Sequence, residues 1–210
     1  TGVQTCALPI SKTLGELPKK IRIIGGNWRS RLLSVVDVPG LRPTTDRIRE
    51  TLFNWLGQDL AGLHCLDLFA GTGALGFEAA SRGAALVVLL EKDKKAYSNL
   101  KANFASLQSS PAAGVVEILH HDSWGYLKQQ PDLSSNLIFI DPPFQDSTLL
   151  NEVIVEAARV CDDSSGGGIY VEFPASRSRE ELEVLLPKWH CGKYLEAGQV
   201  KACLFRSGRG

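Results

Sequence analysis

Five short apolar runs alternate with segments of helical pattern, and this alternation limits the possible folds more than any other feature. The runs end at or near Asp67, Leu90, Leu119, Ile140 and Phe173. Such alternation predicts an α/β protein, because each helix carries the chain back to start another parallel strand. Two further β-type runs, 189–196 and 199–206, have only Ala197-Gly198 between them and predict a terminal hairpin. The expected fold is a mostly parallel sheet with an antiparallel edge.

The fourth run, Leu137–Ile140, is followed at once by Asp141, Pro142, Pro143 and Phe144. Four consecutive apolar residues between such boundaries predict a buried parallel strand. Proline lacks an N–H, and it drives the residue before it away from the helical region. The Asp141 carboxylate and the two proline carbonyls are therefore expected as acceptors where the strand stops. Open α/β sheets bind their ligands at that edge.

Acceptors beside a flat aromatic ring suit a planar base that carries an exocyclic amine. Phe144 can stack on the base, which is worth roughly 1–3 kcal/mol, while Asp141 and a proline carbonyl accept the amine hydrogens. Pulling these hydrogens out of the ring plane would restore the nitrogen lone pair and direct it. The alternative interpretation of these four residues alone is a strand that ends in a proline-containing turn.

A second candidate site follows the strand that ends in Asp67. Gly71, Gly73 and Gly76 have GxGxxG spacing and precede a helical segment. Glycine permits positive φ and close approach of a ligand to the backbone, but dinucleotide-binding enzymes share this spacing. The Asp67 carboxylate favours a different ligand, because it would repel a pyrophosphate and suits the ammonium group of a methionine-like moiety.

Two more acids are expected at the same sheet edge. Glu91 ends the second run, twenty residues after Gly71, where an acid can accept hydrogen bonds from both hydroxyls of a ribose. Hydrogen bonds to a charged group are worth roughly 1.5–3 kcal/mol each. Asp122 follows the third run and can accept from the amino group of an adenine.

The formal net charge is zero, but its distribution is uneven. Residues 12–49 contain nine Lys or Arg and three Asp or Glu, a local excess of +6. Within this stretch, two short β-type runs flank Gly25-Gly26 and predict a hairpin. Its basic side chains, with Trp28 as a stacking platform, suit the phosphates and bases of a polyanion. The alternative is a solvated, charged edge that only prevents aggregation of the sheet.

A helix is predicted from Thr45 or Asp46, either of which can cap it, to Gly57. Arg42 and Arg47 precede or open this helix, whose positive end attracts anions. Both are candidate contacts for a phosphate or for the carboxylate of a cofactor.

The composition, with 210 residues of which 44% are hydrophobic, predicts one globular domain with an appendage. Five cysteines without a CxxC pair predict reduced thiols in a cytosolic protein, with no disulfide framework and no metal site. No apolar run approaches the roughly 20 residues of a membrane span. Residues 1–10 resemble the translation of a sequencing adapter, and the chain contains no methionine. We expect a non-native segment over 1–10, a basic extension over 11–44 and a catalytic domain over 45–210.

Four segments together resemble one bacterial family: IRIIGGNWRSRLL, PGLRPTTDRIRETLFNWL, CLDLFAGTGALGFEAASRGA and IFIDPPF. From about residue 20 to residue 206, the chain resembles the RsmD family of 16S rRNA (guanine-966 N2)-methyltransferases. These are class I enzymes that depend on S-adenosylmethionine. The resemblance implies a Rossmann-like, seven-stranded methyltransferase sheet. It also implies 16S rRNA or a small-subunit assembly particle as partner, no metal, no membrane, a monomer and a cytoplasmic location.

The resemblance also implies three groups of site residues. The cofactor-binding group is Asp67, Phe69, Ala70, Gly71, Gly73, Glu91, Lys92 and Asp122. The catalytic loop is Asp141, Pro142, Pro143 and Phe144. The RNA-binding group is Arg22, Asn27, Trp28, Arg29, Arg31, Arg42, Thr44 and Arg47.

Three other functions fit parts of the pattern. An adenine-N6 methyltransferase acting on DNA or RNA would use the same acidic, proline-containing loop. An NAD-dependent oxidoreductase would share the glycine spacing, although hydride transfer does not need that loop. A non-catalytic RNA-binding module would keep a relic cofactor pocket, and the presence of Asp67, Glu91 and Asp141 disfavours it.

Overall fold

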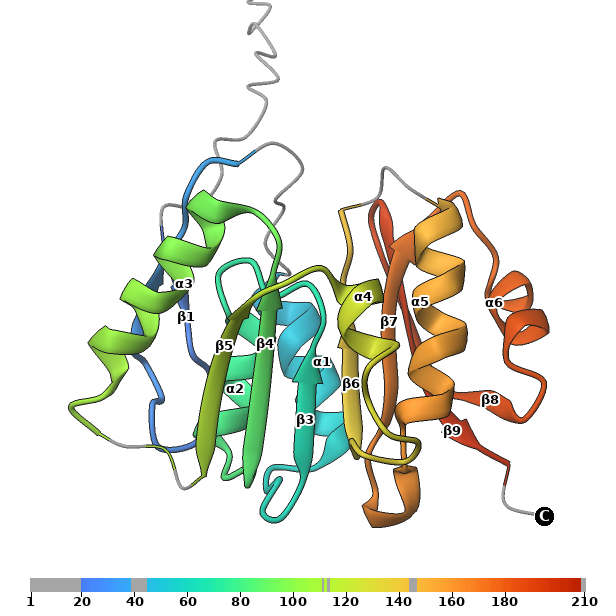
Figure 1. The fold of residues 1–210 in the computed structure, drawn as a ribbon, viewed down its shortest axis with the longest axis horizontal. Helices are drawn as coiled ribbons and strands as arrows, with labels where there is room; N and C mark the ends of the chain where they lie inside the picture. Colours follow the sequence, from blue (N-terminus) through green and yellow to red (C-terminus); the bar gives the residue numbers. More distant parts are fainter. Residues whose placement is uncertain (1–19, 39–44, 111, 113, 144–146, 209–210) are drawn as a thin grey trace, which may run out of the picture.

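A computed structural model of the chain describes residues 20–38, 45–110, 112, 114–143 and 147–208 (Figure 1). Its centre is a seven-stranded sheet with the order β5-β4-β3-β6-β7-β9-β8. The strands are β3 (His64–Asp67), β4 (Leu86–Glu91), β5 (Val115–His120), β6 (Leu137–Ile140), β7 (Gly168–Pro174), β8 (Trp189–Ala197) and β9 (Val200–Ser207). The pairs from β5 to β7 are parallel, whereas β9 is antiparallel to both β7 and β8. The predicted α/β sheet with an antiparallel terminal hairpin is confirmed.

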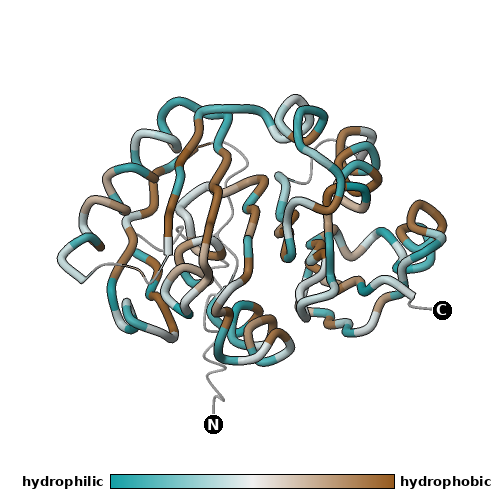
Figure 2. The backbone as a smooth tube through the Cα atoms, turned by 60° about the horizontal axis from the view of Figure 1, so that its bottom comes forward, coloured by the Kyte–Doolittle hydropathy of each residue, from teal (hydrophilic) through white to brown (hydrophobic). Residues whose placement is uncertain are grey.

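Helices cover both faces of the sheet (Figure 1). One face packs against α1 (Asp46–Leu56), α2 (Ala74–Ser81) and α3 (Lys94–Leu107). The other packs against α4 (Ser123–Leu127), α5 (Ser147–Val160) and α6 (Arg179–Leu185), and the 3₁₀ helix Asp163–Ser165 follows α5. The tube in Figure 2 is most hydrophobic along the central strands, as expected for a sheet buried on both faces. No helix in the described ranges is long and apolar enough to cross a membrane.

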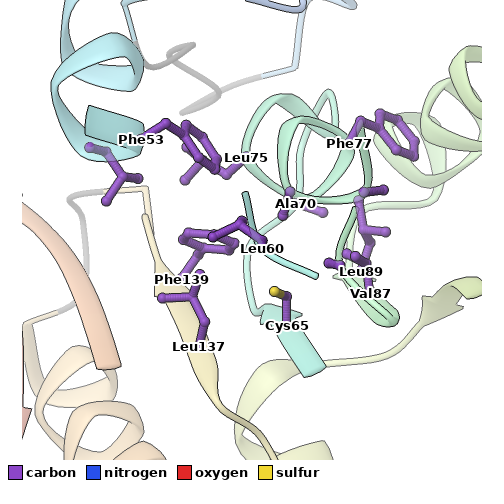
Figure 3. Close-up of a cluster of buried hydrophobic side chains, with 14 of the residues drawn as sticks. Phe53, Leu60, Cys65, Ala70, Leu75, Phe77, Val87, Leu89, Leu137 and Phe139 are labelled. Carbon is purple, nitrogen blue, oxygen red and sulfur yellow. The ribbon is translucent and has the colours of Figure 1, made fainter. Parts of the chain in front are cut away.

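The core shows how β6 is fixed between these layers. All four of its side chains are buried, and they alternate between the two faces. Phe139 points toward Phe53 of α1, with the ring centroids 6.2 Å apart (Figure 3). This packing holds β6, which ends just before Asp141, against α1.

The predicted first helix is confirmed, because α1 begins after Thr45 and ends before Gly57. The Thr45 side chain caps it by accepting from the Ile48 N–H, at 3.4 Å. Helix α3 begins at Lys94, because the Asp93 side chain accepts from the Ala96 N–H and caps it. The five-residue helix α4 was not predicted from the sequence.

The basic extension contains a two-stranded antiparallel sheet of β1 (Lys20–Arg22) and β2 (Leu32–Ser34). The predicted hairpin exists, but the prediction that Gly25-Gly26 forms its tight turn is wrong. Residues 23–31 connect the strands, and the glycines lie against α2 instead. Gly26 has φ of 72°, and a Cβ there would come within 1.9 Å of the Ser81 carbonyl oxygen. Close backbone contact explains the glycine pair.

Trp28 is part of the core, so its predicted role as a stacking platform for RNA is wrong. Its side chain is only 1% exposed and meets Phe77 and Phe104 edge-on, with centroids 6.2 and 6.4 Å away. The Trp28 backbone N–H donates to Ser81 Oγ at 2.8 Å, and its indole N–H donates to the Ser110 carbonyl. A buried indole whose N–H is already satisfied cannot stack on a nucleobase.

The cysteines depart in part from the prediction of reduced thiols. Cys65 and Cys161 are free and buried, as expected. Cys191 of β8 and Cys203 of β9 are paired as a disulfide, with their Cα atoms 5.9 Å apart. That separation is normal for bridged residues on neighbouring strands. The prediction was wrong for this pair because it rested on the absence of a CxxC pair, although the predicted terminal hairpin already placed both cysteines on neighbouring strands.

A buried carboxylate connects the two-stranded sheet of β1 and β2 to the part of the chain that forms the seven-stranded sheet. Glu78 of α2 is fully buried and accepts from the backbone N–H groups of Ile24 and Gly25, both at 2.7 Å. It also forms ion pairs with two arginines, at 2.8 Å to Arg82 and 3.6 Å to Arg49. Both arginine side chains are nearly or fully buried. Glu78 therefore compensates two positive charges that water does not reach.

Replacing Glu78 should destabilise the fold strongly. The change Glu78→Ala leaves Arg82 buried without its carboxylate and Arg49 paired only with Asp46, and breaking a buried pair in this way costs about 3–5 kcal/mol. Urea unfolding followed by circular dichroism would measure the loss. The control is Glu50→Ala, an exposed position of α1, where surface substitutions change stability by about 0.5 kcal/mol or less. Equal losses in the two variants would contradict the role assigned to Glu78.

Candidate active site

A cavity of about 820 Å³ opens at the carboxyl ends of the parallel strands. Its walls come from the loop after β3, the end of β4, the start of α4, the segment after β6 and the turn between β8 and β9. Thr45 and Ile48, from the start of α1, complete the lining on one side. This is the sheet edge at which the sequence predicted a ligand site.

The loop after β3 is held by two acids. Asp67 is 2% exposed, and its Oδ2 accepts from the Gly76 N–H at 2.9 Å. Glu91 Oε2 accepts from the Gly71 N–H, also at 2.9 Å. Gly73 does not line the cavity but has φ of 84°, and a Cβ there would come within 2.2 Å of the Phe77 ring. Its contribution is to let the loop turn into α2.

The environment of Asp67 alters its titration. Burial of the carboxyl group, and to a smaller degree the negative charges of Asp141 and Glu91, raise its pKa to about 7. The backbone N–H groups of Gly76 and Phe69 act in the opposite direction, because they hydrogen-bond the charged form. A cationic ligand group placed here would restore the ionised form.

The other predicted cofactor-binding residues also line this cavity, namely Phe69, Ala70, Gly71, Glu91, Lys92 and Asp122. Glu91 has a fixed position, because its Oε1 accepts from the Asp93 N–H at 2.7 Å in addition to the Gly71 contact. Asp122 caps α4 by accepting from the Gly125 N–H at 2.7 Å. Their binding roles stay predictions.

The predicted catalytic loop contributes three described residues to the same cavity. Asp141 is half-buried, Pro142 is buried and Pro143 is exposed. The structure thus brings Asp141 into one cavity with Asp67 and Glu91, although each follows a different strand. Phe144 lies outside the described residues.

The predicted RNA-binding residues differ in their exposure. Arg22, Asn27, Arg29 and Arg47 are exposed, and Arg22 lies 3.8 Å from Asp46. Arg31 bonds to the last turn of α3 and the residues after it, through the Ser106 carbonyl and through Ser109 Oγ at 3.0 Å. Arg42 and Thr44 lie outside the described residues.

Sequence reasoning missed two acids of the cavity lining, Asp93 and Glu172. Glu172 of β7 is 2% exposed and lines the wall beyond Asp141. The Tyr170 hydroxyl donates to Glu172 Oε1 at 2.8 Å. For Glu172, an acid near the end of an otherwise apolar strand was the available signal, as it was for Asp67 and Glu91.

The cavity is suited to a ligand that carries positive charge and hydrogen-bond donors. Asp67, Glu91, Asp122, Asp141 and Glu172 all line it, and Lys92 is the cation among the described lining residues. The described part of the chain contains no group of three or more His, Cys, Asp or Glu residues that could hold a metal ion.

The sheet order, the antiparallel terminal hairpin and the glycine-loop cavity define a methyltransferase-like α/β protein. The putative methyltransferase SMU.776, solved in complex with SAH, has this fold, with a TM-score of 0.66 and 17% identity over 91% of this chain and 57% of that one. More specifically, the chain belongs to the family described as Conserved hypothetical protein 95, whose model matches residues 21–206.

Individual members of known sequence and structure agree with this assignment. Ribosomal RNA small subunit methyltransferase D of Escherichia coli strain K12 is 42% identical over 190 residues, 89% of this chain and 90% of that protein. The solved structure of the putative methyltransferase yhhF from Escherichia coli has a TM-score of 0.75 and 38% identity, over 90% of this chain and 98% of that one. A putative methylase from Haemophilus influenzae has a TM-score of 0.69 and 32% identity over the same shares.

Removing a neighbouring charge should shift the titration of Asp67. We expect the Asp67 carboxyl carbon to titrate near pH 7 by ¹³C NMR, and Asp141→Asn to lower that midpoint because a repelling charge is lost. The control is Asp93→Asn, which keeps the helix cap and does not contribute to the shift. An ordinary midpoint near 4 in the unsubstituted protein would show that this environment is misassigned.

Proposed function

We propose that the protein transfers a methyl group from S-adenosylmethionine to the N2 amine of a guanine in small-subunit rRNA, with guanine 966 of 16S rRNA as the expected target. The observation that supports this most is the presence of Asp141, Pro142 and Pro143 in one cavity with Asp67 and Glu91. The first three residues suit an amine, and the last two suit a cofactor that carries an ammonium group and a ribose. The family relative named for small-subunit rRNA methylation supports the choice of substrate.

The lining residues fit this cofactor by their chemistry. Asp67 offers a buried carboxylate to the ammonium group, and Glu91 offers acceptors to the ribose hydroxyls. Asp122 offers an acceptor to the adenine amino group, while Phe69 and Ala70 supply apolar surface. When bound, the cofactor supplies an electrophilic methyl group on a positively charged sulfur.

The chain's own contribution to the reaction is to hold and direct the amine. Asp141 and a proline carbonyl accept the two hydrogens of N2, which localises the nitrogen lone pair. The new nitrogen–carbon bond replaces the sulfur–carbon bond, and N2 releases one proton, which Asp141 accepts. Holding the reactants in line can supply up to roughly 7–11 kcal/mol of the barrier reduction. No covalent enzyme intermediate is needed.

The basic extension would hold the RNA backbone while the target base turns into the cavity. Exposed Arg22, Arg29 and Arg47 suit phosphates, with an affinity that falls as salt rises. We expect a cytoplasmic monomer that acts on 16S rRNA or on an assembling small-subunit particle. An adenine-N6 methyltransferase would use Asp141 in the same way. The methylated nucleoside that forms distinguishes the two functions.

The decisive assay transfers a labelled methyl group to small-subunit particles or rRNA from cells that lack this modification. A nucleoside digest should contain N2-methylguanine. N6-methyladenine in its place would overturn the choice of base, and no transfer to any RNA would overturn the proposed function.

The change Asp141→Ala should abolish turnover and leave cofactor binding nearly unchanged, because Asp141 contacts the amine. Single-turnover transfer and calorimetric binding would measure the two properties separately. The control Asp132→Ala changes an acid that is 71% exposed and precedes β6 at the opposite end of the strand. Turnover of Asp141→Ala close to that of the control would refute the assigned role.

Cofactor affinity should depend on pH through Asp67. The ammonium group binds the ionised carboxylate, and in the free protein that form is lost as pH falls through about 7. Affinity should therefore weaken below pH 7, by up to about tenfold per pH unit, and level off above it. Calorimetric titrations with the cofactor over a range of roughly pH 5.5 to 8.5 would measure this dependence of affinity on pH. The change Asp67→Asn should bind more weakly at high pH and show no such slope; an equal slope in both proteins would exclude Asp67 as its source.

A further inference from the structure

Glu172 has no role in the site as described so far, although it is buried in the wall of the cavity. Carboxylates are rarely buried unless their charge is compensated, because desolvation costs several kcal/mol. This one lies on β7, next to the strand that ends in Asp141. Because it lies close to the residue proposed to hold the substrate amine, it can also contact the substrate base.

The strand register places the two acids side by side on one face of the sheet. Phe139 pairs with Tyr170 and Ile140 with Val171, so Asp141 and Glu172 follow at the same level of neighbouring strands. Phe139 and Tyr170 both belong to the core cluster on the α1 side. Side chains two residues further along a strand share that face. Both residues line the cavity, and neighbouring strand backbones lie roughly 4.8 Å apart, so the two acids are close neighbours in its wall.

Tyr170 fixes the orientation of Glu172. Its hydroxyl donates to Oε1 at 2.8 Å, and both side chains are buried. Burial and the nearby charges of Glu172 and Asp141 raise the pKa of Tyr170 well above its usual value, so the phenol keeps its proton. The hydrogen bond from Tyr170 to Oε1 thus fixes the whole carboxylate group, including Oε2, in one orientation.

Two neighbouring acceptors distinguish guanine from the other bases. An ionised carboxylate can only accept hydrogen bonds. The Watson–Crick edge of guanine presents two adjacent donors, N1–H and the N2 amine. Adenine and cytosine present their amine beside a ring nitrogen with a lone pair, which a second carboxylate would repel. A single acid is compatible with all three amines, whereas two acids favour guanine.

We propose that Glu172 is the specificity-determining residue of the site, and that it accepts a hydrogen bond from guanine N1–H while Asp141 accepts from N2. This inference rests on the proposed function and extends it, because it identifies what excludes adenine. Tyr170 acts through Glu172 as a positioning residue.

The test compares guanine with 2-aminopurine, which keeps the N2 amine but has an unprotonated N1. Small-subunit particles are reconstituted around rRNA with either base at the position that the wild-type protein methylates, and kcat/KM is measured for each. The wild type should prefer guanine by roughly 10- to 100-fold, the value of one hydrogen bond to a charged group. In Glu172→Gln this preference should fall to within a few-fold, because an amide can accept from N1–H or donate to N1. The control Glu180→Gln, exposed on α6, should keep the wild-type ratio.

Tyr170→Phe provides a second measurement that does not depend on the behaviour of Glu172→Gln. It keeps the buried ring and removes only the hydroxyl, so the guanine preference should fall to an intermediate value. Wild-type ratios in both variants, with N2-methylguanine still formed, would overturn this inference and leave the proposed function intact. Methylation of adenine by the wild type would overturn both.

Discussion

The buried Glu78 carboxylate is the interaction on which the arrangement of the site depends. It joins the backbone at Ile24 and Gly25 to the arginines of α1 and α2, three parts of the chain that are distant in sequence. A buried charge that loses its partners is strongly destabilising, so few alternative packings of these parts are available. The same network positions α1, whose N-cap Thr45 and first-turn residue Ile48 line the cavity. One charge in the core therefore fixes both the extension and a wall of the site.

The parallel register gives the cavity its chemistry. Asp67 ends β3. Two residues further along the neighbouring strands, Glu91 ends β4, Asp141 follows β6 and Glu172 lies in β7, and all three line the cavity. Burial is the main cause of the raised pKa of Asp67, and the like charges of Asp141 and Glu91 add a smaller cost. A ligand with positive charge and several donors removes that cost on binding. The strain among the acids thus favours a cationic cofactor together with an amine substrate.

Features set by neighbouring residues in the chain were predictable. The apolar run of β6, the Thr45 cap and the acids at strand ends depend on local patterns, and the structure has all of them. Features set by tertiary contacts were not predictable. Trp28 stands among arginines in the sequence, and only its contacts with Ser81 and Phe77 show that it is buried. Arg49 likewise belongs to a basic stretch, yet its side chain pairs with Glu78 in the core. The Cys191–Cys203 pair differs from these, because the predicted terminal hairpin already placed both residues on neighbouring strands.

The separation of charge between the cavity and the extension suggests how a nucleotide would be oriented. Carboxylates line the cavity, whereas Arg22, Arg29 and Arg47 are exposed on the extension and α1. A phosphate is repelled by the first group and attracted by the second, while a neutral base with donor groups is accepted by the acids. The backbone of an RNA would therefore stay outside and present only the base. Charge alone then orients the nucleotide, with its phosphate outside and its base toward the cavity, before any base-specific hydrogen bond forms. The acids then need to distinguish only among bases.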